Sequence, residues 1–523
     1  MHKKILLTLL FSTVSLSNCV FWALPAAAEM IVDTSWVKWY DGPGSDDDCA
    51  LAIAVDGSGN VFVTGYSWSS ETGYDYATIK YYANGDTAWL RRYNGPGTED
   101  LAFAIAVDDS GNVYVTGSSG GLGTGSDYAT IKYRANGDTA WVRRYDGPAS
   151  QRDAACAIGV DDSGNVYVTG SSDGNGTGRD YATIKYDPNG AEVWVRRYNG
   201  PGNAIDEPWA MAVDGSGNVY VTGTHADVGS YPDYFDYATI KYYSNGNTAW
   251  VRTYNGPVSE RDQACAIAID NSGNVFVTGW SNGSGTGNDY ATIKYDASGI
   301  WLWVRRYDGT ASAHDWPAAI ASDDSGNVYV TGTSYGVDTD GDVATMKYDS
   351  DGNELWVRRY NGPANDADWA RAIAIDGTNN VYVTGASLDV WETYEVSVWV
   401  TIKYAPSGDE LWVRRYNGPG HYYDQAEDVG VDGSGHVYVT GSIWAGAYDY
   451  ATIKYFQILR GDVNGDGVIN SADVAYLINY LFKGGPAPEP LEIGNTNCDE
   501  VVNSTDVVYL INYLFKGGPP PEC

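Results

Sequence analysis

Histidine and metal-binding spacings are scarce in this chain. Its 523 residues include five histidines, and no two of those beyond the N-terminal segment lie close in sequence: His225, His314, His421 and His436. Neither His-x-x-x-His nor Cys-x-x-Cys occurs. The spacings that usually bind zinc or a similar transition metal are therefore missing from the sequence.

Positive charge is also scarce. Lys and Arg number 32 against 67 Asp and Glu, which gives a formal net charge of -35. Because such a surface repels phosphates, we expect no nucleic-acid partner. An acidic balance of this size is typical of a soluble extracellular protein or a Ca²⁺-binding protein.

Long hydrophobic runs are missing after the N-terminal segment. No later segment reaches the ~18 apolar residues that a membrane span requires, so we expect no span. Residues 1–28 have the features of a secretory signal peptide: Lys3 and Lys4, an apolar stretch, and a small-residue cleavage site that ends at Ala28. We predict a secreted product. A lipoprotein acylated at Cys19 is the weaker alternative, because Asn18 stands where a small residue is expected.

Cysteine is rare, with six residues in the chain. Cys49, Cys156 and Cys265 occupy the start of the same predicted strand in three different repeats, which favours small buried thiols over disulfides. Cys498 and Cys523 lie together near the C-terminus and could pair in an oxidising compartment.

What the chain has in abundance is one repeated phrase. Val-(Tyr/Phe)-Val-Thr-Gly recurs at intervals of 52 to 56 residues, beginning at Val61, Val113, Val166, Val219, Val275, Val328, Val381 and Val437. A period near 50 indicates a solenoid or a propeller. Each unit contains four short runs of strand character, as at 102–108, 112–119, 127–133 and 139–145. Four antiparallel strands per unit form a β-propeller blade, so we predict an all-β fold.

The ends of the repeat indicate the number of blades. Eight copies contain the first three strands, but the fourth, which reads Trp-Val-Arg-Arg-Tyr in most copies, follows only seven of them. A matching strand, Trp-Val-Lys-Trp-Tyr, stands at 36–40. We predict an eight-bladed propeller over 36–455, in which the N-terminal strand completes the last blade and removes exposed sheet edges. Seven blades or an open array are the alternatives.

The connections divide between two faces of such a propeller. Tight turns join strand one to two and strand three to four, and they share one face. Longer connections join strand two to strand three, as at 120–125, and strand four to the next strand one, as at 94–100. They share the other face, here called the long-loop face. Because binding residues concentrate on variable loops held by a rigid scaffold, we expect the functional site there.

Residues that recur in the blades are interpreted as scaffold. The Trp that heads strand four should pack between blades. The Asp and Lys of Asp-Tyr-Ala-Thr-Ile-Lys-Tyr should form a ring of ion pairs. Tryptophans that break the repeat are more informative: Trp209, Trp316 and Trp369 near the start of strand one, and several in or near the strand two to three loops. From the latter we select four candidates for stacking on a sugar ring, against the alternative of packing under longer loops: Trp68, Trp280, Trp391 and Trp444.

The phrases Asp-x-x-Gly-Asn-Val-Tyr-Val-Thr-Gly and Asp-Tyr-Ala-Thr-Ile-Lys-Tyr resemble those of the SBBP-type β-propeller repeat family, and less closely those of the NHL repeat. The resemblance extends over most of the chain. It implies the propeller fold but no single activity, because propellers include both enzymes and binding proteins.

Sequence patterns for catalysis are weak. Gly-x-Ser-x-Gly begins at Gly117, Gly170 and Gly279, but each match leads from a strand into a Gly/Ser loop, whereas a nucleophile elbow needs a strand-to-helix turn. Acid pairs for glycoside hydrolysis, such as Glu427 with Asp428, stay open. We assign no catalytic residue.

The sequence changes character after Arg460. Residues 462–473 place oxygen-bearing side chains at alternate positions of an EF-hand-type loop, with Gly467 at the sharp turn. The predicted Ca²⁺ ligands are Asp462, Asn464, Asp466, the carbonyl of Val468, Asn470 and Asp473. A helix follows, with one apolar face formed by Val474, Leu477, Ile478 and Leu481.

A second copy of the loop spans 495–506 and is followed by a matching helix. Its predicted ligands are Asn495, Asn497, Asp499, Val501, Asn503 and Asp506. Asn495 removes the charge at the first loop position, and Glu500 replaces the glycine of the sharp turn. We therefore predict one strong Ca²⁺ site and one weaker site.

Two calcium loops, each ending in Asp and each followed by one helix, resemble a type I dockerin over 461–523. The resemblance implies a cohesin module as the partner and an extracellular, cellulosome-like assembly. It also implies that the tenth and eleventh loop positions contribute to recognition, here Ser471, Ala472, Ser504 and Thr505.

Three functions remain open at this point. The favoured one is a secreted propeller that binds a carbohydrate or a protein and is anchored by Ca²⁺-dependent dockerin–cohesin pairing. The second is a polysaccharide hydrolase or lyase with its active site on the long-loop face. The third is a structural scaffold without a small ligand.

Overall fold

The computed structural model describes residues 30–44, 46–226, 234–258, 260–337, 339–391, 394–465, 468–499 and 501–521. The predicted signal peptide lies outside them. The chain divides into a large unit, Val32–Phe456, and a small unit that includes Gln457–Cys523.

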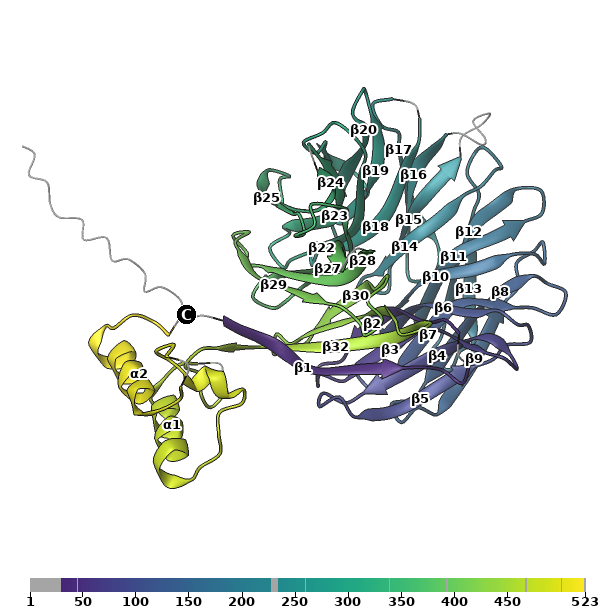
Figure 1. The fold of residues 1–523 in the computed structure, drawn as a ribbon. Coiled ribbons are helices and arrows are strands. Elements are labelled where there is room, and N and C mark those ends of the chain that lie inside the picture. The colour runs from purple at the N-terminus through teal and green to yellow at the C-terminus, as the bar shows by residue number, and fades with distance from the viewer. Residues whose placement is uncertain are drawn as a thin grey trace, which may run out of the picture. The chain divides into compact units, whose positions relative to one another are not determined.

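The large unit is a ring of eight four-stranded antiparallel sheets (Figure 1). The first four blades consist of β2 (Asp48–Val55), β3 (Val61–Ser69), β4 (Gly73–Tyr81), β5 (Thr87–Tyr93); β6 (Asp100–Val107), β7 (Val113–Gly120), β8 (Ser126–Tyr133), β9 (Thr139–Tyr145); β10 (Asp153–Val160), β11 (Val166–Gly174), β12 (Gly178–Tyr186), β13 (Glu192–Tyr198); and β14 (Glu207–Val213), β15 (Val219–Ala226), β16 (Phe235–Tyr242), β17 (Thr248–Tyr254). The next three consist of β18 (Asp262–Ile269), β19 (Val275–Gly283), β20 (Gly287–Tyr295), β21 (Trp301–Tyr307); β22 (Asp315–Ser322), β23 (Val328–Gly336), β24 (Thr339–Tyr348), β25 (Glu354–Tyr360); and β26 (Asp368–Ile375), β27 (Val381–Trp391), β28 (Tyr394–Tyr404), β29 (Glu410–Tyr416).

The eighth blade joins the two ends of the propeller sequence. Its strand order is β1-β32-β31-β30, with β1 (Met30–Tyr40), β30 (Gln425–Val431), β31 (Val437–Trp444) and β32 (Tyr448–Leu459). Figure 1 shows β1 running beside β32. The first strands of successive blades contact one another around the ring, and β30 of the last blade contacts β2 of the first. The prediction of eight blades closed by the N-terminal strand is confirmed.

The repeated Trp residues pack between blades, as the sequence predicts. Trp141 of the second blade is 7% exposed, and its ring lies 5.9 Å from that of Tyr186 in the third blade. Its indole Nε1 donates to the carbonyl of Pro188, also in the third blade. Burial of an aromatic ring together with its polar edge explains why this position is Trp in each blade.

The predicted ring of Asp–Lys ion pairs is wrong. Asp127 pairs with Arg144 on the neighbouring strand at 2.7 Å, while Lys132 donates to the carbonyl of Pro188 and lies over the ring of Tyr114. Asp127 and Lys132 are five positions apart on one strand, so they point to opposite faces and lie about 17 Å apart along it. The Arg of strand four meets the Asp instead.

The small unit contains two helices, α1 (Ser471–Lys483) and α2 (Ser504–Lys516), and a 3₁₀ turn, η1 (Leu491–Gly494). Asn470 and Asn503 cap the helix N-termini. The helices pack together through a small core of Val463, Val474, Leu477, Val507 and Leu510. None of the helices in the described part of the chain has the length and apolar character that crossing a membrane requires.

Candidate functional sites

The first calcium loop is closed by its last residue. Asp473 is fully buried, and its carboxylate accepts from the backbone N–H groups of Asn464 (3.0 Å) and Asn470 (2.8 Å). Asp462 is also buried. Asp466 and Gly467 lie outside the described residues. The backbone therefore holds the last carboxylate of the loop against the N-terminus of α1.

The second loop repeats this frame with Asp506, which accepts from the N–H groups of Asn497 (3.2 Å) and Asn503 (2.8 Å). Its other predicted ligands are hydrogen-bonded to one another. The Asn497 amide donates to Asp499 Oδ2 (3.0 Å) and to Thr505 Oγ1 (2.8 Å). Coordination through Asp499 would compete with these bonds. Glu500 lies outside the described residues.

The residues predicted to meet the partner lie on the surface. Ser471 and Ala472 in α1, and Ser504 and Thr505 in α2, are exposed in the first turn of each helix. Cys498, beside the second loop, is disulfide-bonded. Cys523 lies outside the described residues, so its pairing with Cys498 stays a prediction.

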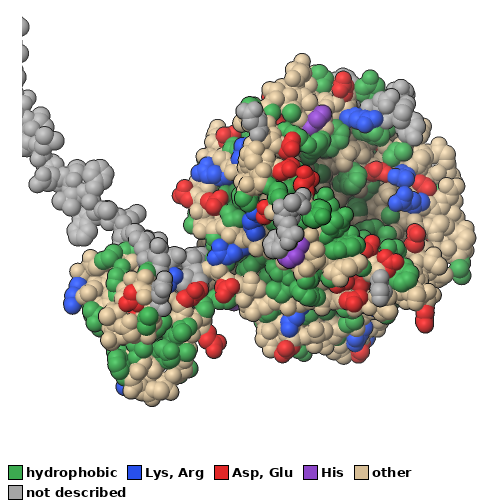
Figure 2. All heavy atoms as spheres, in the orientation of Figure 1, with side chains coloured by type: hydrophobic (Ala, Val, Ile, Leu, Met, Phe, Trp, Pro, Cys, Tyr) green, Lys and Arg blue, Asp and Glu red, His purple; other side chains and the backbone are tan. Residues whose placement is uncertain are grey.

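The propeller has a pocket of about 660 Å³ inside the ring, lined by the first strands of five consecutive blades, β14, β18, β22, β26 and β30. Its aromatic and polar lining consists mainly of Trp209, Trp316, Trp369, Arg371, Gln425 and Glu427. These residues belong to the beginning of each strand, which follows the connection from strand four. The pocket, here called the axial pocket, therefore opens toward the long-loop face. Figure 2 shows hydrophobic side chains gathered in a hollow at the middle of one face of the propeller.

A β-bulge sits at the same position of each of these strands. In β14 the pairing register shifts between Pro208 and Ala210, which leaves Trp209 unpaired, and the corresponding residues of β26 and β30 are Arg371 and Glu427. All three line the axial pocket. Bulges commonly redirect a side chain next to a binding site, and here they direct chemically different residues to one place.

Two of the pocket tryptophans are notably accessible. Trp209 is 46% exposed and Trp316 is 38% exposed. His314 stacks on Trp316, with ring centroids 5.4 Å apart and an interplanar angle of 10°. The arrangement offers flat apolar surfaces on which an uncharged ring could stack.

Arg371 and Glu427 supply the charge of the axial pocket. Arg371 Nε lies 3.8 Å from Glu427 Oε2. Burial raises the pKa of Glu427, and the nearby Arg371 opposes that rise. The neighbouring Asp428 accepts from the backbone N–H of Ile53 in the first blade, and burial raises its pKa to about 6.

The tryptophans selected from sequence are not brought together. Trp68, Trp280 and Trp444 are half-buried in three different blades, and none lines the axial pocket. Trp444 packs against Tyr422 and Tyr448. The side chain of Trp391 lies outside the described residues, and a role for these four in stacking stays a prediction.

Sequence reasoning noticed Trp209, Trp316 and Trp369 but missed Arg371 and Gln425 and did not place Glu427 in a pocket. The sequence signal that could have identified these residues is their position in the repeat, where they differ from the other blades. In other blades the same strand positions hold residues such as Leu101, Phe103 and Ala154.

The serines of the Gly-x-Ser-x-Gly matches have structural contacts. Ser119, Ser172 and Ser281 accept from the guanidinium groups of the Arg residues of strand four in their own blades: Arg144, Arg197 and Arg306. Each match lies at the end of strand two, as in β11 and β19, and the next element is strand three rather than a helix. The geometry of a nucleophile elbow does not occur at these serines.

Comparisons with known proteins agree with both halves of the chain. The family model described as "Dockerin type I domain" matches residues 460–515. The SBBP model, described as "Beta-propeller repeat", matches residues 51–71, 88–123, 156–176, 193–224, 258–285 and 302–338. No curated protein matches the chain.

Several solved structures are similar at low identity. The β-propeller domain of the Trilobed protease from Pyrococcus furiosus is 10% identical, with 71% of this chain and 100% of that chain covered and a TM-score of 0.38. A mutant of Synechocystis apocarotenoid oxygenase is 10% identical, with 75% and 96% covered and a TM-score of 0.38. A putative gluconolactonase is 11% identical, with 83% and 94% covered and a TM-score of 0.31.

A type I dockerin is a calcium-binding domain and indicates a cohesin as the partner. The chain is an SBBP-type β-propeller repeat protein with a C-terminal type I dockerin.

Proposed function

We propose that this protein is a secreted binding module in which the dockerin attaches to a cohesin and the propeller binds a carbohydrate in its axial pocket. Calcium bound by the two dockerin loops, tightly in the first and more weakly in the second, holds the docking surface in shape. The proposal combines an anchor with a recognition head, and each half has its own supporting observation.

The observation that carries the proposal for the propeller is the convergence of three tryptophans in one pocket. Trp209, Trp316 and Trp369 come from three blades and line it together with Arg371, Gln425 and Glu427. Flat aromatic surfaces beside a few polar groups that fix orientation are the composition expected of a small-ligand site. A sugar ring presents apolar C–H faces to aromatic rings and hydroxyl groups to polar side chains.

A polysaccharide-cleaving activity is the second candidate, favoured by the raised pKa of Glu427. A raised carboxyl pKa is the direction of shift that a general acid requires. Most glycoside hydrolases, however, use two carboxylates on either side of the bond. Among the described residues that line the axial pocket, Glu427 is the only acid. We therefore favour binding over hydrolysis.

The test is a panel of soluble polysaccharides and oligosaccharides, screened against the full chain by calorimetry and, in parallel, for release of reducing ends. We expect binding without product release. Trp316→Ala should weaken the binding by about 2 kcal/mol, or roughly thirtyfold in Kd, as is typical of an anchor residue.

Trp301→Ala is the matched control, because Trp301 is similarly exposed but heads β21 and lies outside the axial pocket. It should bind as the unchanged chain does. Equal losses in both variants, or no binding to any glycan, would contradict a carbohydrate site in the pocket. Product release abolished by Glu427→Gln would establish the enzymatic alternative instead.

A further inference from the structure

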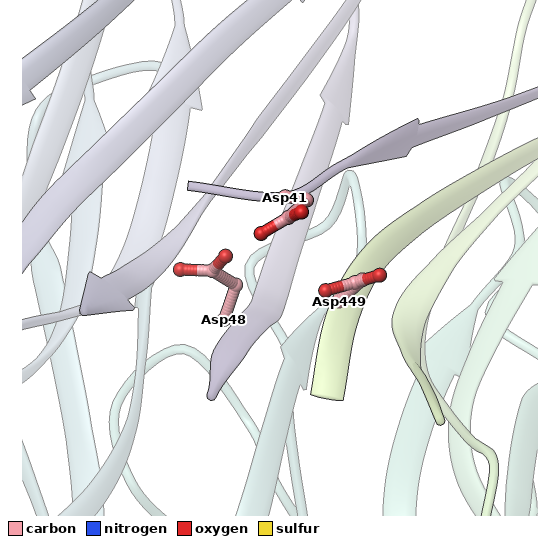
Figure 3. Close-up of side chains that lie close together, drawn as sticks. All are labelled: Asp41, Asp48 and Asp449. Carbon is pink, nitrogen blue, oxygen red and sulfur yellow. The ribbon is translucent and has the colours of Figure 1, made fainter. Parts of the chain in front are cut away.

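Among the described residues, three junctions between blades each bring three aspartates together. At each junction one Asp comes from strand three of a blade, one from the residue after strand four, and one from the start of strand one in the next blade. Their carboxylate oxygens lie within 4.8 Å of one another in each trio: Asp41, Asp48 and Asp449; Asp127, Asp146 and Asp153; Asp289, Asp308 and Asp315. Figure 3 shows the first trio, with side chains that converge from β32, the beginning of β2 and the residue after β1.

The junction of the fifth and sixth blades shows how the oxygens are used. One oxygen of each carboxylate, Oδ2, has a partner: the guanidinium of Arg306 at 2.7 Å from Asp289, the hydroxyl of Ser312 at 3.3 Å from Asp308, and the N–H of Gly309 at 2.8 Å from Asp315. The other oxygen, Oδ1, of Asp289 and Asp308 is buried and has no hydrogen-bond partner in the described part of the chain, whereas the carboxylate of Asp315 also has the Ser334 hydroxyl beside it. Asp289 and Asp315 are only 4% and 1% exposed.

The junction of the second and third blades repeats the arrangement. Asp127 pairs through Oδ2 with Arg144 at 2.7 Å, and Asp153 accepts through Oδ2 from the N–H of Gly147 at 2.7 Å. The buried Oδ1 of Asp127 again has no partner among the described residues, whereas the carboxylate of Asp153 also has the Ser172 hydroxyl beside it. Asp146, the third member of this trio, is exposed, and its Oδ2 accepts from the hydroxyl of Ser150 at 3.1 Å.

The closing junction differs in one respect. Oδ1 of Asp48 accepts from the backbone N–H of Trp68 at 3.0 Å, and Oδ2 accepts from that of Gly42. Both carboxylate oxygens of the buried Asp48 already accept a hydrogen bond, so we do not propose an ion at this junction.

A buried carboxylate oxygen without a partner is costly, and three carboxylates facing one guanidinium leave negative charge uncompensated. Burial, with neighbouring aspartates adding to it, raises the pKa of Asp315. Three hard carboxylate oxygens within 4.8 Å of one another, two of them from buried residues, are the kind of donor that Ca²⁺ prefers. The positive charge of the ion would neutralise the carboxylate charge that the guanidinium leaves uncompensated.

We propose that the junctions Asp127–Asp146–Asp153 and Asp289–Asp308–Asp315 each bind one Ca²⁺ ion, separately from the dockerin. Each ion links strand three and the end of strand four of one blade to strand one of the next. The two sites act as clamps between blades at two points of the ring. The inference is independent of the ligand proposed for the axial pocket.

The chain provides its own controls. The residue after strand four is Asp in these junctions but Asn in five others: Asn94, Asn199, Asn255, Asn361 and Asn417. Asn is therefore compatible with the loop, and Asp308→Asn and Asp146→Asn should fold. In the opposite direction, Asn361→Asp would complete a trio with the buried Asp342 and Asp368.

The experiment measures Ca²⁺ bound per full-length chain by equilibrium dialysis and atomic spectrometry at about 1 mM free Ca²⁺, the weak end of the range for extracellular modules. Asp146→Asn and Asp308→Asn should each lose one equivalent, and Asn361→Asp should gain one. The dockerin contributes equally to every sample. Unchanged stoichiometry in both loss variants would overturn the proposal.

A second measurement locates the ion. The dockerin, from Gly461 to Cys523, contains no Trp, whereas Trp316 follows Asp315 in the sequence. Tb³⁺ in place of Ca²⁺, excited through tryptophan, should emit from the full chain, and Asp308→Asn and Trp316→Phe should each reduce the emission. Trp316→Phe should keep the full Ca²⁺ stoichiometry. Emission that Asp308→Asn leaves unchanged would place the ion elsewhere and contradict the proposal.

Discussion

In the propeller the residues that recur from blade to blade are mostly buried, whereas in the dockerin the residues that recur from loop to loop carry the oxygens predicted to bind calcium. Trp141 and its counterparts pack one blade against the next. Asp473 and Asp506 close two loops with the same backbone contacts. A repeated residue is thus structural in one half of the chain and a predicted ligand in the other.

The difference follows from how each unit is stabilised. A blade buries its apolar face against two neighbours, so every copy needs the same packing residues, and chemistry is left to positions that vary, such as Trp209 and Arg371. The dockerin has a small core, so we expect its fold to depend on bound calcium. Substitution of a repeated packing residue should therefore destabilise mainly the propeller, whereas calcium removal should destabilise mainly the dockerin.

The largest expected effect is that of calcium removal on the dockerin. In excess chelator the small unit should unfold and cohesin binding should be lost, because so small a core does not stabilise the loops alone. Limited proteolysis of the full chain with mass spectrometry would then show cleavage after about residue 460 and an intact propeller. A dockerin that stays protected and binds cohesin in chelator would contradict this account.

The next largest effect concerns a repeated tryptophan. Trp141→Ala should lower the free energy of unfolding of the propeller by about 3–5 kcal/mol, because it removes a buried ring between two blades. The measurement is urea denaturation followed by tryptophan fluorescence.

Trp316→Ala is the control for that comparison. Its side chain is 38% exposed, so its removal should change the stability by about 1 kcal/mol or less. If the two variants were equally stable, the distinction between repeated and variable tryptophans would fail.

A third, smaller effect concerns a repeated acid of the propeller. Asp368 is fully buried, accepts from the N–H of Gly362, and has its pKa raised to about 6 by burial. Because the folded pKa exceeds the ordinary value, the native state holds the extra proton between about pH 4 and pH 6. The contribution of Asp368 to the stability is therefore greatest below this window and falls by up to about 3 kcal/mol as the pH rises through it.

Asp368→Asn tests that pH dependence. The amide of Asn has nearly the shape of the carboxyl group, and its oxygen can keep the contact that Asp368 Oδ2 makes with the N–H of Gly362. In chelator, the variant should lack this residue's share of the loss between pH 4 and pH 6. An identical profile for both proteins would show that Asp368 does not titrate in that range.

Much of the fold could be predicted from the sequence. The period of the Val-(Tyr/Phe)-Val-Thr-Gly phrase and the turn residues around it specify blades, and the lone strand at 36–40 specifies closure. The prediction that Asp127 pairs with Lys132 was wrong because it matched the two residues by their recurrence alone. Strand alternation already places their side chains on opposite faces of the sheet.

The axial pocket could not be predicted in the same way. Trp209, Trp316 and Trp369 are more than fifty residues apart, and only ring closure brings their strands to one place. The bulge that leaves Trp209 unpaired has no sequence pattern of its own. Loop tryptophans such as Trp68 are more conspicuous in the sequence, but Trp68 is half-buried in the structure.

The smallest expected effect would sharpen the comparison within the dockerin. Asn495→Asp restores the charge that the first position of the second loop lacks, and the first loop has Asp462 there. Ca²⁺ affinity at the second loop should rise about tenfold, or about 1.4 kcal/mol, since affinity in such loops follows the number of charged ligands. The gain in affinity stays modest because the Asn497 amide still donates hydrogen bonds to Asp499 and Thr505, and these bonds must break when the ion binds. Calorimetric titration of the full chain would resolve two classes of dockerin site before the substitution and a smaller difference after it. A second loop that already binds as tightly as the first would show that neither Asn495 nor these hydrogen bonds weaken it.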